Sequence, residues 1–109
     1  MKIEIDLSYL FNDKLLTHLE AKHEIQDLGD AVAHLDLSVE DGVIGYEDYA
    51  PNSEWSSHAT RNIYGDVPYD VDVSFPDQGL SENLVWELTK AIKTMVQEKD
   101  ETLINYINA

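Results

Sequence analysis

The amino-acid sequence predicts an α+β fold, in which a small antiparallel sheet of three to five strands carries a long C-terminal helix on one face. Two patterns lead to this prediction. Three short segments alternate strictly between apolar and polar residues, as half-exposed strands do. One segment near the C-terminus repeats apolar residues at three- and four-residue spacing, as an amphipathic helix does. Because 109 residues is the usual size of one domain, we expect residues 1–109 to form a single domain.

The alternating segments are residues 2–7, 34–40 and 69–75. Their apolar side chains are expected to face the core, and are Ile3, Ile5, Leu7, Leu35, Leu37, Val39, Tyr69, Val71, Val73 and Phe75. Asp41-Gly42 is a typical hairpin dipeptide, so residues 43–46 are predicted as a return strand. Residues 47–66 are rich in turn formers and are predicted as a long loop that contains Trp55.

The remaining N-terminal segments favour a helix over residues 9–23, or a shorter helix that begins at a cap on Asn12 or Asp13. Residues 25–33 are interrupted by Gly29 and fit either a helical turn or a loop.

The clearest helix begins after Ser81, a residue type that caps helix N-termini well. Its apolar stripe consists of Leu84, Val85, Leu88, Ala91, Ile92, Met95 and Val96. The apolar residues that follow, Leu103, Ile104 and Ile107, either continue this helix or form a short final helix capped by Asp100.

Negative charge dominates the composition, since 22 Asp and Glu residues stand against 7 Lys and Arg, for a formal charge of −15. Between Glu24 and Thr89 the only base is Arg61, against fifteen acids. Direct binding to nucleic acid or to anionic lipid is therefore not expected, because such binding depends on Lys and Arg that neutralise phosphates. Adaptation to high salt is disfavoured, because six of the seven bases are lysine.

Alternation places the acids of the strands on the face opposite the core. These outward carboxylates are Glu4, Asp6, Asp36, Glu40, Asp70 and Asp72. In one sheet they would repeat about every 6.6–6.8 Å along a strand and about every 4.8 Å between strands. A lattice of negative charge with this spacing resembles the phosphates of a nucleic acid, although the simpler alternative is an ordinary solvated strand face.

Catalytic and metal-binding motifs are absent from the sequence. There is no cysteine, no phosphate-binding glycine loop and no nucleophile elbow. His18 and His23 are five residues apart, which does not place them on one face of a helix. Two acidic sets are rich in oxygen ligands, but neither follows the calcium-loop spacing; they are Asp36, Glu40 and Asp41, and Asp66, Asp70 and Asp72. The sequence therefore predicts no catalytic residue and no cofactor, with a weak divalent-cation site as an alternative.

Targeting segments are not predicted either. The first residues, MKIEIDLSYLF, lack the apolar run of a secretory signal. No stretch reaches the roughly 18 apolar residues of a membrane span. We therefore expect a cytoplasmic protein.

The leading hypothesis is a non-enzymatic acidic binding protein that inhibits a basic partner by mimicking nucleic acid. In size, acidity and lack of catalytic motifs the chain resembles phage-encoded DNA mimics, among them anti-restriction and anti-CRISPR proteins, and immunity proteins that neutralise nuclease toxins. No family motif matches residue by residue. The expected partner is a nuclease or another nucleic-acid-binding protein. The expected contact residues are Asp36, Glu40, Asp41, Glu47, Asp48, Tyr49, Trp55, Asp70 and Asp72.

Two rival functions come from other classes. One is a small divalent-metal-binding protein or enzyme that uses the Asp and His residues. The other is a structural or assembly subunit that forms an oligomer through the apolar face of the C-terminal helix or through Trp86, which lies beside that face.

Overall fold

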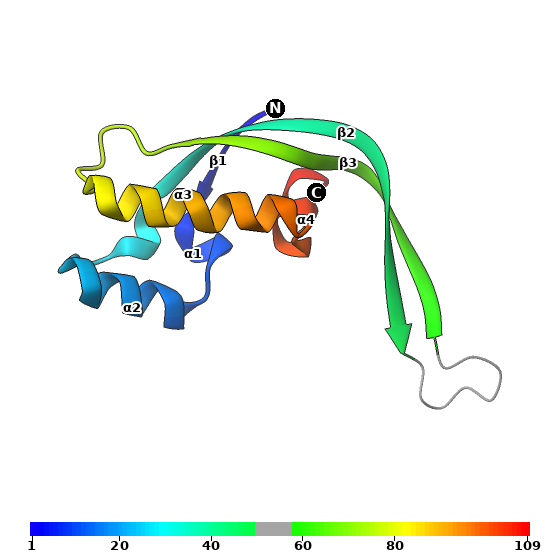
Figure 1. Cartoon of the computed structure of the whole chain (residues 1–109), viewed down its shortest axis with the longest axis horizontal. Coiled ribbons are helices and arrows are strands. Elements are labelled where there is room, and N and C mark those ends of the chain that lie inside the picture. The colour runs from blue at the N-terminus through cyan, green and yellow to red at the C-terminus, as the bar shows by residue number, and fades with distance from the viewer. Residues whose placement is uncertain (50–57) are drawn as a thin grey trace.

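Three strands form one antiparallel sheet in the order β1-β2-β3 in a computed structural model of the chain (Figure 1). The structure describes residues 1–49 and 58–109, and for residues 43–49 and 58–64 it describes the backbone alone. The strands are β1 (Lys2–Asp6), β2 (Val32–Tyr49) and β3 (His58–Ser74). The helices are α1 (Leu7–Leu10), α2 (Asp13–His23), the short 3-10 helix η1 (Leu28–Asp30), α3 (Glu82–Gln97) and α4 (Glu101–Ile107).

The predicted α+β class is confirmed, because the long helix α3 packs against β3 on one face of the sheet. Ser81 caps this helix, and its Oγ accepts a hydrogen bond from the Leu84 N–H at 3.2 Å. The buried residues of α3 follow the predicted stripe and are Leu84, Leu88, Ile92 and Val96. They share one core with the inward side chains of the strands, which include Ile5, Ala33, Leu35, Leu37 and Val71. Burial of both apolar faces against each other therefore holds the two layers together.

The N-terminal helix is divided, because Phe11 and Asn12 separate α1 from α2. The Asn12 Oδ1 accepts a hydrogen bond from the Leu15 N–H at 2.8 Å, so Asn12 is the cap of the shorter helix. The final helix is likewise separate, and Asp100 caps it through the Thr102 N–H at 2.9 Å. Between α2 and β2, the single turn η1 occupies the segment that the sequence left open between a helical turn and a loop.

The predicted hairpin turn at Asp41-Gly42 is wrong. β2 continues through both residues, and Gly42 pairs with Gly65 in β3. Residues 47–49 and 58–66, predicted as loop, belong to β2 and β3, while Trp55 lies outside the described residues. A side chain at Gly42 would place its Cβ 2.7 Å from the Val67 Cγ2, so this glycine serves close packing within a strand rather than a turn.

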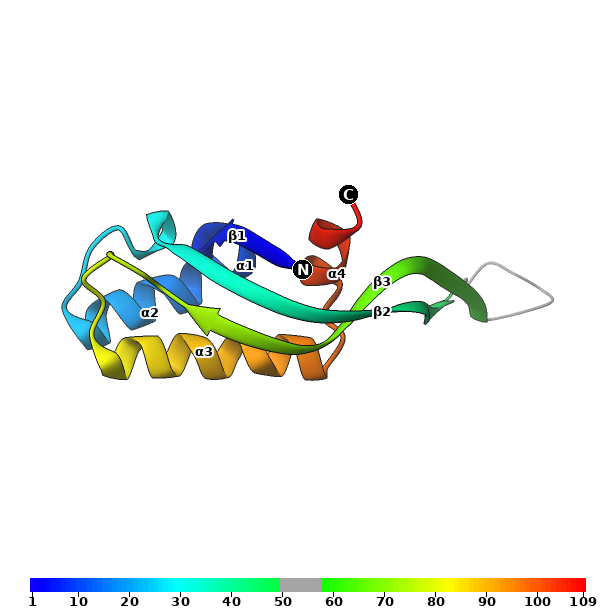
Figure 2. The same cartoon turned by 90° about the horizontal axis from the view of Figure 1, so that it is seen from above.

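A β-bulge lies where the register between β2 and β3 shifts, next to Ser38 and Val39. Ser38 pairs with Asp70 and Val39 with Pro68, so Tyr69 has no partner. Tyr69 was predicted to face the core, but it is 57 % exposed, because the extra residue breaks the alternation. The two strands twist about each other beyond this point, as Figure 2 shows.

The segment after α3 forms hydrogen bonds with both edge strands of the sheet, β3 and β1. The Asn108 side-chain amide accepts from the Asp66 N–H at 2.8 Å and donates to the Asp66 carbonyl at 2.9 Å. The Lys99 Nζ donates to the Pro68 carbonyl at 3.1 Å. The Tyr106 hydroxyl donates to the Glu4 carbonyl of the edge strand β1 at 2.9 Å. These contacts occupy backbone groups that an edge strand otherwise leaves open.

Leu88→Ala is expected to lower the free energy of unfolding by about 2–5 kcal/mol, because Leu88 is fully buried between α3 and the sheet. Urea denaturation followed by circular dichroism measures this change. Lys93→Ala, on the exposed side of the same helix, is the control and should change stability by less than about 0.5 kcal/mol. Equal stability of the two variants would contradict the proposed packing of α3.

Gly65→Ala is expected to destabilise the protein by about 1–3 kcal/mol. Gly65 has φ +152°, and an added Cβ would overlap the Asn108 amide that holds Asp66. Gly79→Ala is the control, since Gly79 also has a positive φ, of +66°, but nothing lies within 4 Å of the Cβ that the substitution would add. If thermal unfolding shows the same stability for both variants, the close approach of Asn108 to β3 is not real.

Candidate partner-binding surface

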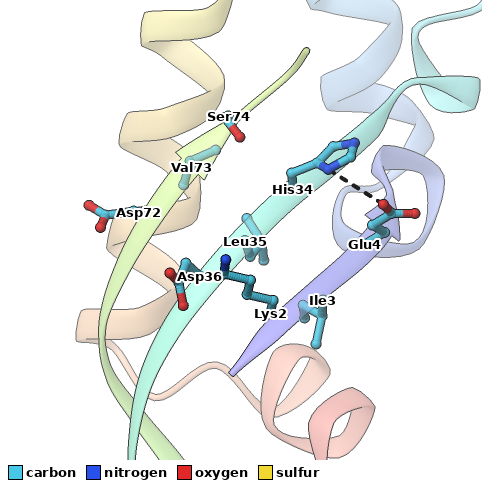
Figure 3. A pocket seen from close by; sticks show the side chains of 9 residues that line it. All are labelled: Lys2, Ile3, Glu4, His34, Leu35, Asp36, Asp72, Val73 and Ser74. Atoms are coloured by element: carbon cyan, nitrogen blue, oxygen red, sulfur yellow. Dashed lines mark ion pairs between the residues drawn. The ribbon is translucent and has the colours of Figure 1, made fainter.

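The outer face of the sheet lies opposite α1, α2 and α3, and it carries a shallow hollow of about 580 Å³ (Figure 3). All three strands contribute to this hollow. Its outward polar residues are Lys2, Glu4, His34, Asp36, Asp72 and Ser74. We call this region the outer sheet face. The inward side chains of the same strands are buried in the core and hold the sheet in place. The backbone of the sheet therefore sets the positions of the outward side chains.

One row across this face places Asp36 between Lys2 of β1 and Asp72 of β3. The amino group of Met1 lies 3.7 Å from the Asp36 Oδ1, and it also donates to the Leu37 carbonyl at 2.8 Å. On the β3 side Asp36 has another carboxylate opposite it. Like charges at directly opposite strand positions repel each other, so this side of the row favours an added cation.

The neighbouring row consists of Glu4, His34 and Ser74. The His34 Nδ1 lies 3.5 Å from the Glu4 Oε1, as the dashed line in Figure 3 marks. His34 lies on β2, so together with Lys2 of β1 and the Met1 amino group it places basic groups on both of these strands. The expected carboxylate lattice is therefore interrupted by basic groups on β1 and β2, while the polar residues that β3 contributes to the hollow are Asp72 and Ser74.

The structure places five of the nine expected contact side chains, and all five are exposed: Asp36, Glu40, Asp41, Asp70 and Asp72. They follow the paired strands β2 and β3. Glu47, Asp48 and Tyr49 belong to the backbone of β2, where they pair with Thr60, Ala59 and His58, but their side chains lie outside the described residues, as does Trp55.

The lysines are distributed differently from these acids. Lys14 and Lys22 are on α2, while Lys90 and Lys93 are on α3, so four of the six lysines lie on the helical side of the molecule. The paired strands β2 and β3 contain eight Asp and Glu residues and, as their only Lys or Arg, Arg61. The segments β2 and β3 therefore carry a formal net charge of −7, whereas the four lysines of α2 and α3 are balanced by four carboxylates in the same helices.

An ion-pair cluster that the sequence did not reveal joins α2 to α3. The Glu87 carboxylate contacts the Lys22 Nζ through Oε1 and the His23 Nε2 through Oε2, the latter at 2.5 Å. The hydrogen bond from Lys22, followed by that from His23, lowers the pKa of Glu87 below its ordinary value of 4.5. Because more than sixty residues separate these partners in the chain, no local sequence pattern signals this contact.

Metal binding finds no support in the described part of the chain, where no group of three or more His, Asp or Glu residues could hold an ion. The two oxygen-rich sets singled out in the sequence do not converge, because their members follow extended strands. His23 is engaged by Glu87.

Comparison with known proteins finds no match for this chain among protein-family models, curated proteins or solved structures. Among the described residues no helix is long and apolar enough to cross a membrane. The interpretation of function therefore depends on the surface of the molecule.

Glu87→Gln is expected to lower the stability above the ordinary pKa of 4.5, and the difference from wild type is expected to disappear as pH falls through the lowered pKa. Since the pKa of Glu87 is lowered in the folded state, its ion pairs stabilise the protein above pH 4.5, and this contribution is lost as pH falls through the lowered pKa. Urea denaturation across a pH series measures the difference between variant and wild type. Glu98→Gln is the control, because the described residues show no ion pair between Glu98 and α2. A difference between Glu87→Gln and wild type that does not change with pH would rule out this linkage.

Proposed function

We propose that this protein is a non-enzymatic, cytoplasmic inhibitor that binds the basic nucleic-acid-binding surface of a nuclease or of a DNA- or RNA-binding protein. It competes with nucleic acid for that surface, as phage anti-restriction and anti-CRISPR proteins and nuclease immunity proteins do. The observation that supports this proposal is the group of exposed carboxylates Asp36, Asp70 and Asp72 on the neighbouring strands β2 and β3. Asp36 and Asp72 line the outer sheet face, and Asp70 lies two residues from Asp72, which places it on the same side of β3.

The spacing of these carboxylates suits Arg and Lys side chains. Asp70 and Asp72 lie two residues apart on β3, which separates them by about 6.6–6.8 Å, and Asp36 lies on the next strand, about 4.8 Å away. Guanidinium and ammonium groups that hold successive phosphates can form charge-assisted hydrogen bonds to carboxylates arranged in this way. We therefore expect the partner to use the same basic residues for this protein and for its nucleic acid.

The ordered strands that carry these carboxylates favour tight binding. Asp36 lies on the central strand, between the buried residues Leu35 and Leu37. Asp72 follows the buried Val71. Because the backbone is already ordered, binding loses less conformational entropy than it would for a flexible acidic tail.

The separation of charge also favours one orientation of approach. A formal charge of −15 attracts a basic partner over a distance of about 8 Å at physiological salt. Since α2 and α3 carry equal numbers of lysines and carboxylates while β2 and β3 carry eight carboxylates and Arg61, the attraction is greatest toward the sheet. The outer sheet face is thus the surface that the partner meets first.

The triple variant Asp36→Asn, Asp70→Asn, Asp72→Asn is expected to weaken inhibition at least about tenfold, the change that 1.4 kcal/mol of lost binding energy produces. Purified restriction endonucleases, CRISPR effectors and nuclease toxins are each tested for displacement from labelled DNA or RNA by the wild-type protein. Displacement of at least one enzyme is expected, and it should weaken steeply as salt rises.

The control is a second triple variant, Asp30→Asn, Glu82→Gln, Glu98→Gln, which changes the net charge by the same amount. All three of its positions are exposed and lie outside the sheet. It should inhibit nearly as well as wild type. If the two triple variants lose inhibition equally, the outer sheet face is not the contact surface. If no enzyme in the panel is displaced, the proposed function is wrong.

A further inference from the structure

Trp86 on α3 is 63 % exposed, more than any other large hydrophobic side chain in the described part of the chain. The Lys90 Nζ lies 5.1 Å from the centre of its ring, a cation–π distance that holds the indole against the helix. An isolated apolar side chain on a surface needs no explanation. Trp86 is different because of the surface that surrounds it.

Trp86 lines two hollows that are formed by residues of α2 and α3. The larger, of about 520 Å³, has an apolar floor formed by Leu15 and Leu19 of α2 and by Ala91 of α3. The smaller, of about 260 Å³, includes Lys22 and other polar side chains. Trp86 lines both hollows, so an exposed aromatic ring stands directly beside an apolar cavity.

An exposed aromatic ring and a hollow with apolar lining residues thus belong to one surface patch. In a dimer with two-fold symmetry the same patch meets itself, so the Trp86 ring of each copy can enter the larger hollow of the other. Buried Trp residues of this kind supply much of the binding energy at protein interfaces. The hollow is also large enough to receive an aromatic side chain.

The distribution of charge also favours contact between two copies through the face formed by α2 and α3. A formal charge of −15 makes two copies repel each other at most orientations. The segments of α2 and α3 carry four lysines and four carboxylates, and are therefore balanced, whereas β2 and β3 carry eight carboxylates and Arg61. Contact between two helical faces keeps the acidic strands of the two copies farthest apart.

We infer that the α2–α3 face binds a second copy of this chain, with Trp86 of each copy seated among Leu15, Leu19 and Ala91 of the other. This inference is independent of the proposed inhibitor function, because the outer sheet face lies on the opposite side of the sheet. Both acidic faces stay open in such a dimer.

Sedimentation velocity over a range of concentrations tests this inference on the full chain. The wild type is expected to form a dimer whose affinity rises as NaCl increases from about 0.05 M to about 0.5 M, because salt screens the repulsion between copies. This trend is opposite to the one expected for binding of a basic partner, so failure of one proposal is distinguishable from failure of the other.

Trp86→Ala is expected to weaken the dimer at least about 30-fold, the change that loss of an interface hot spot produces. Thr94→Arg, which places a long side chain in the larger hollow from an exposed helical position, should weaken it at least about tenfold. Tyr69→Ala, at an exposed aromatic on β3, is the control and should leave the dimer unchanged. A monomer at all concentrations up to about 1 mM, or a dimer that Trp86→Ala does not weaken, would overturn the inference.

Discussion

Burial of the apolar stripe of α3 against the inner face of the sheet is the interaction on which the rest of the structure depends. Leu88 and Ile92 are fully buried, and Leu35 and Leu37 on the central strand are each only 2 % exposed. Because side chains alternate along a strand, fixing one set of residues in the core turns the other set toward solvent. The exposure of Asp36 on the outer sheet face is therefore a consequence of how α3 packs.

Alternation alone does not explain the strand pair β2 and β3, which continues past the helices as a two-stranded ribbon (Figure 1). A two-stranded ribbon is only marginally stable by itself, so its first part needs support from the body of the protein. The two hydrogen bonds between Asn108 and Asp66 provide that support close to the bulge at Tyr69. Gly65 permits the close approach of Asn108.

The two layers divide the chemistry of the surface between them. Carboxylates dominate the sheet, whereas the helical side combines lysines with an exposed aromatic residue, Trp86. Glu87 ties α2 to α3 through Lys22 and His23, and so keeps the groove beside Trp86 in place. A strongly acidic protein can in this way present one face for a cationic partner and a second, balanced face on which contact with an equally acidic molecule is least costly.

The sequence by itself determined the elements that depend on local periodicity and caps. These include β1, the beginning of α3 at Ser81, and the outward direction of Asp36 and Asp72. Only the tertiary structure decided which strands pair and in what register. Asp41-Gly42 carries a strong local turn signal, yet pairing with distant residues such as Gly65 prevails over it. The register between β1 and β2 places Lys2 beside Asp36, and the packing of α2 on α3 brings Lys22 into contact with Glu87. Contacts between residues far apart in the chain produce no repeating pattern in the sequence, because they depend on tertiary packing.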